Sequence, residues 1–455
     1  MLTYQLDEKN KYYSLYYNIR EDILHGVLSA GERLPGKRTL AEHLAVSVIT
    51  VQTAYEQLLA EGYIISEERR GYFVAEVNVG ESADPVIPIR EEQPRIKYDL
   101  DLTTGRAPAE LFPFSVWASL MRKTLSEEGE HLLERVPCDG SPRLKAAIAA
   151  YLFRFRGFKV DPRYIVVGAG AEYLYGVIVQ LLGRDKPYAV ENPGYGRVPN
   201  TYRLNGADCI FIDVEEKGVN IEEVERSNAC ALHISPAHQY PTGAVIPVPN
   251  RSRLIAWAQS NNAYIIEDDY DSEFRLWGKP LQTMAAMNGE RVIYLNTFSK
   301  TLAPSMRMGY MVLPPVIYAN YLQLYSQTAN VVPLFEQLTL AAMLDGGYFE
   351  RHVNRLKNYY KGIRGELISL IDSLPFDKRI IETGGGLHLT TCLPDFSSDE
   401  EIKTKAEEYG INVKCLSDYL FTTTDKYDKV AVINYSSVTG ERLKRIKKKL
   451  NGEYI

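Results

Sequence analysis

Seven short apolar runs between residues 164 and 313 constrain the fold of this chain more than any other feature. Each is nearly continuous in hydrophobicity, and segments long enough for helices separate several of them. Continuous apolar strands that alternate with helices are typical of a sheet covered on both faces. The pattern therefore predicts an α/β domain. The runs are 164–167, 188–190, 209–212, 229–234, 263–266, 292–295 and 310–313.

Other segments differ in character and predict further parts of the chain. At 455 residues the chain is too long for one typical domain. Residues 76–98 contain prolines and charges without a clear period, which is typical of a linker. After about residue 330 come helical stretches and then mixed strands and helices, so we expect a smaller C-terminal α+β subdomain. The predicted organisation is a first domain at 1–75, a linker at 76–98 and a large domain at 99–455.

Several classes of protein are disfavoured by composition. No stretch approaches 18 apolar residues, and the polar N-terminus lacks the apolar core of a signal peptide. The cysteines are odd in number, scattered and without metal-ligand spacing, so we expect free thiols in a reducing cytoplasm, no metal site and no membrane partner. They are Cys138, Cys209, Cys230, Cys392 and Cys415.

The first 75 residues carry the pattern of three short helices and a hairpin. Apolar residues at helical spacing predict a first helix that stops near Gly26. Thr39 and Ser47 have side chains suited to cap a second and a third helix. Two short apolar runs, 63–65 and 72–74, predict strands joined by a turn. This order is that of a winged helix-turn-helix, whose third helix enters the DNA major groove.

The charge of this segment does not by itself favour DNA. The whole chain has a net charge of −6, and the first 80 residues hold eight Lys or Arg against eleven Asp or Glu. The placement of charge is more favourable, since basic residues flank the predicted second helix and the wing, where they suit phosphate contacts. A small helical domain with ordinary solvated charges remains the alternative. The basic residues are Arg33, Lys37, Arg38, Arg69 and Arg70, and the exposed face of the third helix offers Val48, Thr50, Gln52 and Thr53.

The string LPGKRTLAEHLAVSVITVQTAYEQLLAEGYI, followed by RRGYFV, resembles the winged helix of GntR-type regulators over residues 12–75. The resemblance implies that Arg38, Ser47, Thr50 and Gly71 lie at double-stranded DNA. The chain departs from the family at Val48, where an arginine is common, so the operator sequence does not follow from the relatives.

Lys300 is the first of four signals in the large domain. It closes Asn296-Thr297-Phe298-Ser299-Lys300, just after the apolar run 292–295. Open α/β sheets bind ligands at the carboxyl ends of their strands, and an amine there is able to form a Schiff base with pyridoxal 5′-phosphate (PLP). Thr297 and Ser299 offer hydroxyls to the phosphate, and Arg307 offers a bidentate contact. By itself, the spacing between this lysine and this arginine is weak evidence for a PLP site.

The other three signals fit the same cofactor. Glu267-Asp268-Asp269-Tyr270 supplies a carboxylate for the pyridine nitrogen and a phenol for the ring oxygen. Gly168-Ala169-Gly170-Ala171-Glu172 lets backbone N–H groups approach a phosphate. In Pro193-Gly194-Tyr195-Gly196-Arg197, the tyrosine suits stacking on the ring and the arginine suits a carboxylate. Each signal has an ordinary structural alternative, such as a solvated acidic loop or a tight turn.

Together these motifs resemble the fold type I aminotransferase family, and the whole order resembles the MocR/GabR group of regulators. The motifs LFPFSVW, ENPGYG, PAHQYPTG, EDDYDSEF and FSKTLAPSMRMGY occur in the expected order. The resemblance implies that Lys300 carries PLP as an aldimine, with Asp268 at the pyridine nitrogen, Tyr270 at the ring oxygen and Tyr195 on the ring. It also implies a domain-swapped homodimer. The residues expected around the phosphate are Ala171, Glu172, Ser299 and Arg307.

Two positions depart from typical aminotransferases. Tyr240 stands where they carry an asparagine, and Val432 stands where many carry the arginine that holds the substrate α-carboxylate. We therefore expect a PLP-dependent regulator that senses an amine or amino-acid-like effector by exchange at Lys300, with Arg197 as effector contact and at most weak transaminase activity. One alternative is an active aminotransferase with an accessory DNA-binding domain. Another is a plain repressor whose large domain only dimerises.

Overall fold

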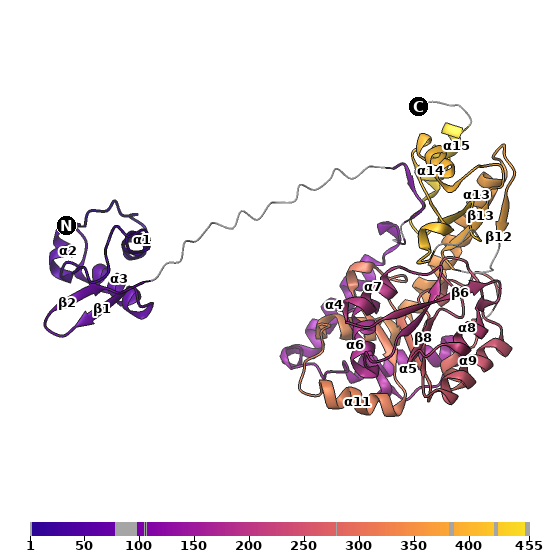
Figure 1. The fold of residues 1–455 in the computed structure, drawn as a ribbon, viewed down its shortest axis with the longest axis horizontal. Coiled ribbons are helices and arrows are strands. Elements are labelled where there is room, and N and C mark those ends of the chain that lie inside the picture. The colour runs from indigo at the N-terminus through magenta and orange to yellow at the C-terminus, as the bar shows by residue number, and fades with distance from the viewer. Residues whose placement is uncertain are drawn as a thin grey trace. The chain divides into compact units, whose positions relative to one another are not determined.

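The computed structural model describes residues 2–77, 98–103, 105, 107–278, 280–381, 386–422 and 426–450. The chain divides into two compact units, Met1–Arg95 and Ile96–Ile455, which are indigo and magenta to yellow in Figure 1. Each unit has its own apolar core. The predicted linker, 76–98, lies almost entirely outside the described residues.

The N-terminal unit consists of three helices followed by an antiparallel hairpin, which is the predicted winged helix-turn-helix. Its third helix begins where we expected, because the Ser47 side chain accepts a hydrogen bond from the Thr50 backbone N–H at 3.1 Å. The elements are α1 (Lys11–Leu24), α2 (Lys37–His43), α3 (Val48–Ala60), β1 (Ile64–Glu67) and β2 (Gly71–Val74).

The predicted cap of the second helix is wrong. α2 begins two residues before Thr39, and Gly36 occupies the cap position without any side-chain hydrogen bond. A tertiary contact accounts for the earlier start, since the buried Tyr55 on α3 donates its hydroxyl to the Pro35 carbonyl at 2.9 Å. That contact holds the chain just before α2, so the local preference of threonine for a cap does not set the boundary.

The large unit is built on an eight-stranded sheet in the order β4-β11-β10-β9-β8-β5-β6-β7. The strands from β10 to β6 run parallel, as both-face burial predicts, whereas β11 is antiparallel to its two neighbours. All seven predicted runs are strands of this sheet. The strands are β4 (Ile165–Gly168), β5 (Tyr188–Asn192), β6 (Cys209–Glu215), β7 (Gly218–Val219), β8 (Ala231–Ile234), β9 (Tyr264–Asp268), β10 (Val292–Thr297) and β11 (Gly309–Val312).

The antiparallel direction of β11 follows from a short connection. Residues 298–308 join β10 to β11 and contain only a 3-10 turn, Pro304–Met306, which is too short for a crossover helix. The chain therefore turns back directly, and the turn carries both Lys300 and Arg307 at the end of the sheet.

Helices cover both faces of the sheet, and each face has its own apolar core (Figure 1). Side chains of α6, α7 and α11 pack on one face, and those of α5, α8, α9 and α12 on the other. Among the described residues, no helix combines the length and the apolar character needed to cross a membrane. The helices are α4 (Phe114–Glu128), α5 (Pro142–Arg156), α6 (Ala171–Leu182), α7 (Arg197–Leu204), α8 (Ile221–Arg226), α9 (Val248–Ser260), α10 (Met284–Met287), α11 (Pro315–Tyr325) and α12 (Leu334–Asp345).

The C-terminal part of this unit forms the expected smaller α+β subdomain. Its antiparallel sheet has the order β12-β13-β16-β15, and a separate parallel pair joins β14 to β3, which lies near the start of the unit. The elements are β3 (Leu100–Asp101), α13 (Tyr348–Asp372), β12 (Arg379–Ile381), β13 (His388–Cys392), α14 (Asp399–Glu408), β14 (Ile411–Asn412), β15 (Lys414–Cys415), the 3-10 helix η6 (Leu416–Tyr419), β16 (Val430–Asn434) and α15 (Gly440–Leu450).

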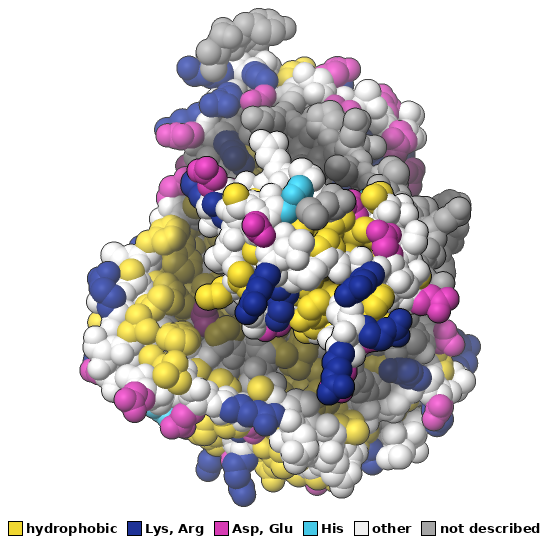
Figure 2. Space-filling model, turned by 90° about the vertical axis from the view of Figure 1, so that its left-hand side faces the viewer, with side chains coloured by type: hydrophobic (Ala, Val, Ile, Leu, Met, Phe, Trp, Pro, Cys, Tyr) yellow, Lys and Arg dark blue, Asp and Glu magenta, His cyan; other side chains and the backbone are white. Residues whose placement is uncertain are grey.

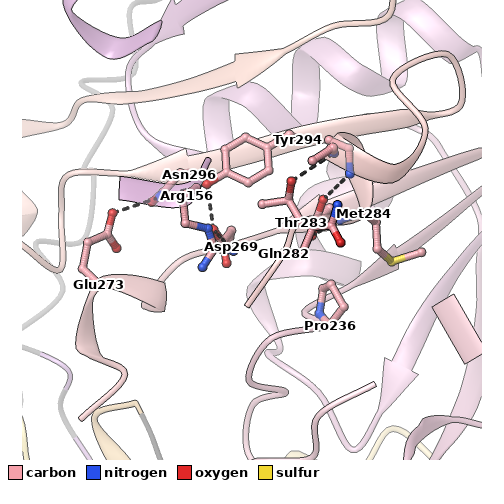
Figure 3. A network of polar contacts seen from close by, with 12 residues as sticks. Arg156, Pro236, Asp269, Glu273, Gln282, Thr283, Met284, Tyr294 and Asn296 are labelled. Atoms are coloured by element: carbon pink, nitrogen blue, oxygen red, sulfur yellow. Dashed lines mark hydrogen bonds and ion pairs between the residues drawn. The ribbon is translucent and has the colours of Figure 1, made fainter. Parts of the chain in front are cut away.

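A buried ion pair fastens helix α5 to the end of β9. The Arg156 guanidinium lies 2.9 Å from a carboxylate oxygen of Asp269, and both side chains are almost completely buried. Figure 3 shows the Tyr294 hydroxyl donating to the same carboxylate, at 2.7 Å, with Asn296 and Glu273 alongside. Because a charge removed from water is costly without its partner, each member depends on the other.

We expect Arg156→Met to lower the free energy of unfolding of the large unit by about 3–5 kcal/mol, since it leaves Asp269 buried without a counter-charge. Urea unfolding followed by tryptophan fluorescence is a suitable measurement, because Trp117, Trp257 and Trp277 all belong to this unit.

The control is Arg154→Met on the same helix. It breaks the surface pair with Glu350, so it should cost less than about 1 kcal/mol. The double variant Arg156→Met/Asp269→Asn should recover part of the loss. Equal losses for the two arginine variants would contradict the role of the buried pair.

Candidate functional site

A cavity of about 530 Å³ lies at the carboxyl ends of the parallel strands of the large unit. β8, β9 and β10 end at this cavity, and so does the turn that enters helix α6. This is the position where open α/β sheets bind ligands. All ten residues that the sequence assigned to the cofactor or the effector line it, namely Ala171, Glu172, Tyr195, Arg197, Asp268, Tyr270, Thr297, Ser299, Lys300 and Arg307.

The Lys300 amine is held in a narrow space. A Cβ atom on Gly105 would overlap the Lys300 Nζ atom in this arrangement, so the Gly105 backbone lies close to the amine. Burial lowers the pKa of the Lys300 amine, an effect that the nearby carboxylates of Asp271 and Asp268 oppose. A lowered pKa increases the neutral fraction of the amine, which is the nucleophilic form.

The Asp268 carboxylate is buried and has one oxygen without a partner. Its Oδ2 atom accepts a hydrogen bond from the Tyr175 hydroxyl and lies 3.3 Å from His233 Nε2, while the Tyr202 hydroxyl lies 2.6 Å from the other ring nitrogen of His233. Among the described residues, no hydrogen-bond partner reaches its Oδ1 atom. Buried carboxylate oxygens normally accept a hydrogen bond. The Asp268 Oδ1 atom is therefore suited to accept one from an N–H group of a bound ligand.

The end of the cavity at the start of helix α6 is suited to bind an anion. Gly170 precedes the helix with a φ of 87°, in the region that favours glycine, and the Arg307 guanidinium lies beside it. The helix has 12 residues, so its first backbone N–H groups and this cation face the same space. The Thr297 hydroxyl is engaged within the turn, because it donates to Ser299 Oγ at 2.9 Å and accepts from the Ser299 N–H at 3.2 Å.

Three predicted residues have partners that the sequence did not indicate. Arg197, which we expected to contact the effector, forms an ion pair at 2.6 Å with Glu172, which we expected near the phosphate. The Tyr270 hydroxyl donates to the His238 carbonyl at 3.2 Å. The Tyr195 ring packs edge-on against Tyr240, with ring centroids 6.0 Å apart.

Residues of the C-terminal subdomain also line the cavity, and sequence reasoning missed them. They include Lys414 on β15, Tyr419 at the end of η6 and Asn434 at the end of β16. The Tyr240 hydroxyl donates to the Tyr419 hydroxyl at 2.9 Å across the cavity wall. No motif or spacing connects these positions to Lys300 in the sequence. Val432, by contrast, is buried in an apolar cluster with Leu416 and Val430.

In the N-terminal unit, the residues expected at DNA lie on helix α2, at the start of helix α3 and at the start of strand β2 in the wing. Arg38 is exposed on α2, and Thr50 is partly exposed near the start of α3, where the Ser47 hydroxyl lies 2.8 Å from its own. Gly71 begins β2 with a φ of 116°, in the region that favours glycine. In Figure 2, several Lys and Arg side chains, in dark blue, lie close together near the middle of the view.

Comparison with known proteins identifies both units. The family of bacterial regulatory proteins called gntR matches residues 11–74, and the family of class I and II aminotransferases matches residues 99–425. The chain is 32% identical to the probable rhizopine catabolism regulatory protein MocR of Rhizobium meliloti, over 93% of this chain and 90% of that protein. It belongs to the MocR-type family of GntR regulators.

A further relative agrees with this assignment, and solved structures share the fold of the large unit. The HTH-type transcriptional regulator YhdI of Bacillus subtilis is 34% identical over 90% of this chain and 89% of its own length. Among solved structures, the α-aminoadipate aminotransferase LysN of Thermus thermophilus superposes with a TM-score of 0.67 at 22% identity, covering 78% of this chain and 92% of its own. The Pyrococcus horikoshii kynurenine aminotransferase gives a TM-score of 0.68 at 21% identity, covering 80% and 92%.

A MocR-type regulator binds DNA through its winged helix, and PLP is the cofactor of its aminotransferase-class domain. The cavity fits this group in three respects. Asp268 offers an unpartnered buried oxygen, Lys300 offers an amine with a lowered pKa, and Gly170 with Arg307 offers an anion cradle.

Glu191, which also lines the cavity, makes stability depend on pH. Burial raises the pKa of its carboxyl to about 8, although the Ser235 backbone N–H at 3.3 Å opposes this. In the unfolded chain a Glu carboxyl ionises near pH 4.3. Between these values the folded chain holds a proton that the unfolded chain has lost, so the free energy of unfolding falls as the pH rises.

We therefore expect Glu191→Gln, which mimics the neutral carboxyl, to stabilise the protein relative to the native chain by on the order of 2 kcal/mol at pH 8 and much less at pH 5. Urea unfolding at several pH values measures this. The exposed Glu216→Gln serves as control and should show no such trend. A pH-independent difference for Glu191→Gln would contradict the assignment of a neutral carboxyl.

Proposed function

We propose that this MocR-type regulator senses an amine or amino-acid-like effector at the PLP bound through Lys300 and converts its binding into a change of DNA affinity. The observation that carries the proposal is the meeting of the Lys300 amine with the unpartnered Asp268 oxygen in one cavity, in a chain that also carries a winged helix. When bound, the cofactor supplies an aldehyde that exchanges one amine for another.

The side chains of the cavity have separate roles in this proposal. Asp268 keeps the pyridine nitrogen protonated, and the hydrogen bond from Tyr175 together with His233 fixes the orientation of its carboxylate. Tyr195 would stack on the ring, Tyr270 would contact the ring oxygen, and Arg197 would contact the effector. The phosphate is held by Ala171, Glu172, Thr297, Ser299 and Arg307, through backbone N–H groups, hydroxyls and the guanidinium.

Active transamination is the second candidate, since the residues that would hold the cofactor are all present. One observation favours sensing over turnover. The Val432 side chain is apolar and buried, so it cannot hold a carboxylate. A substrate that is not fixed against rotation reacts slowly, and misplacement of this kind can cost on the order of a hundredfold in rate.

The proposed active form is a homodimer, and exposed apolar side chains support it. Phe114 and Leu125 on α4 and Leu324 on α11 are all exposed. Figure 2 shows a broad apolar area toward its left side. Exposed apolar areas of this kind often mark protein interfaces. An effector would change DNA binding only through different affinities for two arrangements of this dimer.

Lys300→Ala should abolish the visible absorbance of the covalently bound cofactor and its fixation by borohydride, because it removes the amine proposed to bind the cofactor covalently. The same variant should lose every effect of amines on DNA affinity. The measurements are a spectral titration with a panel of amines and DNA binding in the presence of the same amines, with Lys405→Ala as a surface control.

A Lys300→Ala protein that keeps a borohydride-reducible cofactor would refute the assignment of this lysine. Rapid multiple turnover of amino groups to a keto acid by the native chain, with no effect of any amine on DNA affinity, would favour the aminotransferase instead.

For the DNA-binding unit, we expect Arg38→Ala to weaken binding across DNA sequences and to reduce the salt slope by about one, as for a lost phosphate contact. Fluorescence anisotropy with labelled operator and random DNA over a salt series measures both quantities. Lys9→Ala, exposed in the same unit, is the matched control. An unchanged affinity and salt slope for Arg38→Ala would argue against a phosphate contact.

A further inference from the structure

One cation on the cavity wall has been assigned neither to the cofactor nor to an ion pair. Among the described residues, four cationic side chains line the cavity, which are Arg197, Lys300, Arg307 and Lys414. Lys300 is the cofactor lysine of the proposed function, Arg307 lies beside Gly170 at the anion end, and Arg197 is paired with Glu172. Lys414 remains, and it comes from the smaller subdomain.

The Lys414 ammonium is poised for an anionic group. The residue is exposed, and its Nζ atom lies 5.6 Å from the centre of the Tyr419 ring, an aromatic contact that leaves its hydrogen-bond donors available. None of the carboxylates in the described part of the chain forms an ion pair with it. The acids that line the cavity are Glu172, Glu191 and Asp268, and each contacts residues other than Lys414.

A second donor accompanies Lys414 on the same wall. Tyr419 accepts the hydroxyl proton of Tyr240 at 2.9 Å, so its own hydroxyl proton is free to point to another acceptor. Lys414 and Tyr419 are five residues apart, on β15 and at the end of η6, and both line the cavity. An ammonium and a phenol side by side form a suitable site for a carboxylate.

The strand register accounts for the position of the Lys414 side chain beside the cavity. Lys414 pairs directly with Val432 across the β15–β16 ladder. The position on β16 that carries a carboxylate-binding arginine in many aminotransferases is therefore apolar in this chain, while its cross-strand partner carries the positive charge.

We propose that Lys414, with Tyr419, binds the acidic group of an effector whose amine reaches the cofactor at Lys300. This inference rests on the proposed function and narrows the effector to an amino acid with its carboxylate remote from the reacting amine. Such a ligand would touch the large sheet at one end and the smaller subdomain at the other.

The location of Lys414 also connects the effector to the DNA-binding unit along the chain. β14 ends at Asn412, two residues before Lys414, and pairs in parallel with β3 at Leu100 and Asp101. The Asp99 N–H donates to the Gly410 carbonyl at 2.9 Å, and the Leu102 N–H donates to the Asn412 carbonyl at 2.9 Å. The first described residues after the linker segment are thus bonded to the strand that precedes Lys414 in the chain.

The experiment compares matched ligands on the PLP-loaded full chain. Spectral titrations use ω-amino acids of increasing length and the alkylamines of equal length, with the native chain, Lys414→Gln, Lys414→Arg and the surface control Lys405→Gln. We expect the native chain to bind the best acid roughly tenfold to a hundredfold more tightly than its matched alkylamine. Lys414→Gln should remove this preference, and Lys414→Arg should keep most of it.

Unchanged alkylamine affinity and an unchanged cofactor spectrum in Lys414→Gln show that the variant is folded and loaded. A full preference for the acid in that variant would overturn the proposal, and so would a preference lost in Arg197→Gln but kept in Lys414→Gln. If no amine alters the spectrum of the native chain, the proposed function fails instead, so the two failures are distinguishable.

Discussion

The three consecutive acids at the end of β9 impose the constraint on which the rest of this architecture depends. Glu267, Asp268 and Asp269 are all buried, and each needs a different kind of partner. Glu267 accepts two backbone N–H groups at the start of α10, and burial raises the pKa of its carboxyl to about 7. Asp269 is neutralised by Arg156. Asp268 alone keeps an unpartnered oxygen, and it is the one that faces the cavity.

The sheet and most of its site were predictable from the sequence because both depend on local signals. Continuous apolar runs mark strands buried on two faces, and the motifs that follow those runs must meet at one edge of a parallel sheet. This reasoning brought Lys300, Asp268 and Tyr195 into one cavity. It did not show that β11 is antiparallel, since that depends on the length of one turn, nor that Gly36 begins α2, since a tertiary contact of Tyr55 fixes that boundary.

The opposite wall of the cavity was not predictable, because long-range pairing sets it. Lys414 and Tyr419 belong to short elements of two and four residues, which carry no periodicity. Their place beside the site follows from the pairing of β15 with β16 and from the Tyr240–Tyr419 hydrogen bond, which joins residues 179 positions apart. Arg197 illustrates a related limit, since its sequence context indicated a ligand contact but not its ion pair with Glu172.

A sensor and an enzyme place opposite demands on such a cavity. An enzyme must hold its substrate most tightly in the transition state, whereas a sensor gains from a bound state that persists and differs in shape from the free one. In the proposed sensor, the buried and apolar Val432 side chain cannot hold the carboxylate of a reacting substrate. Its cross-strand partner on β15 is the cation Lys414, which follows two residues after β14, the strand that pairs with β3. In the proposed function, a charge on β15 in place of one on β16 would hold an effector without fixing it for reaction.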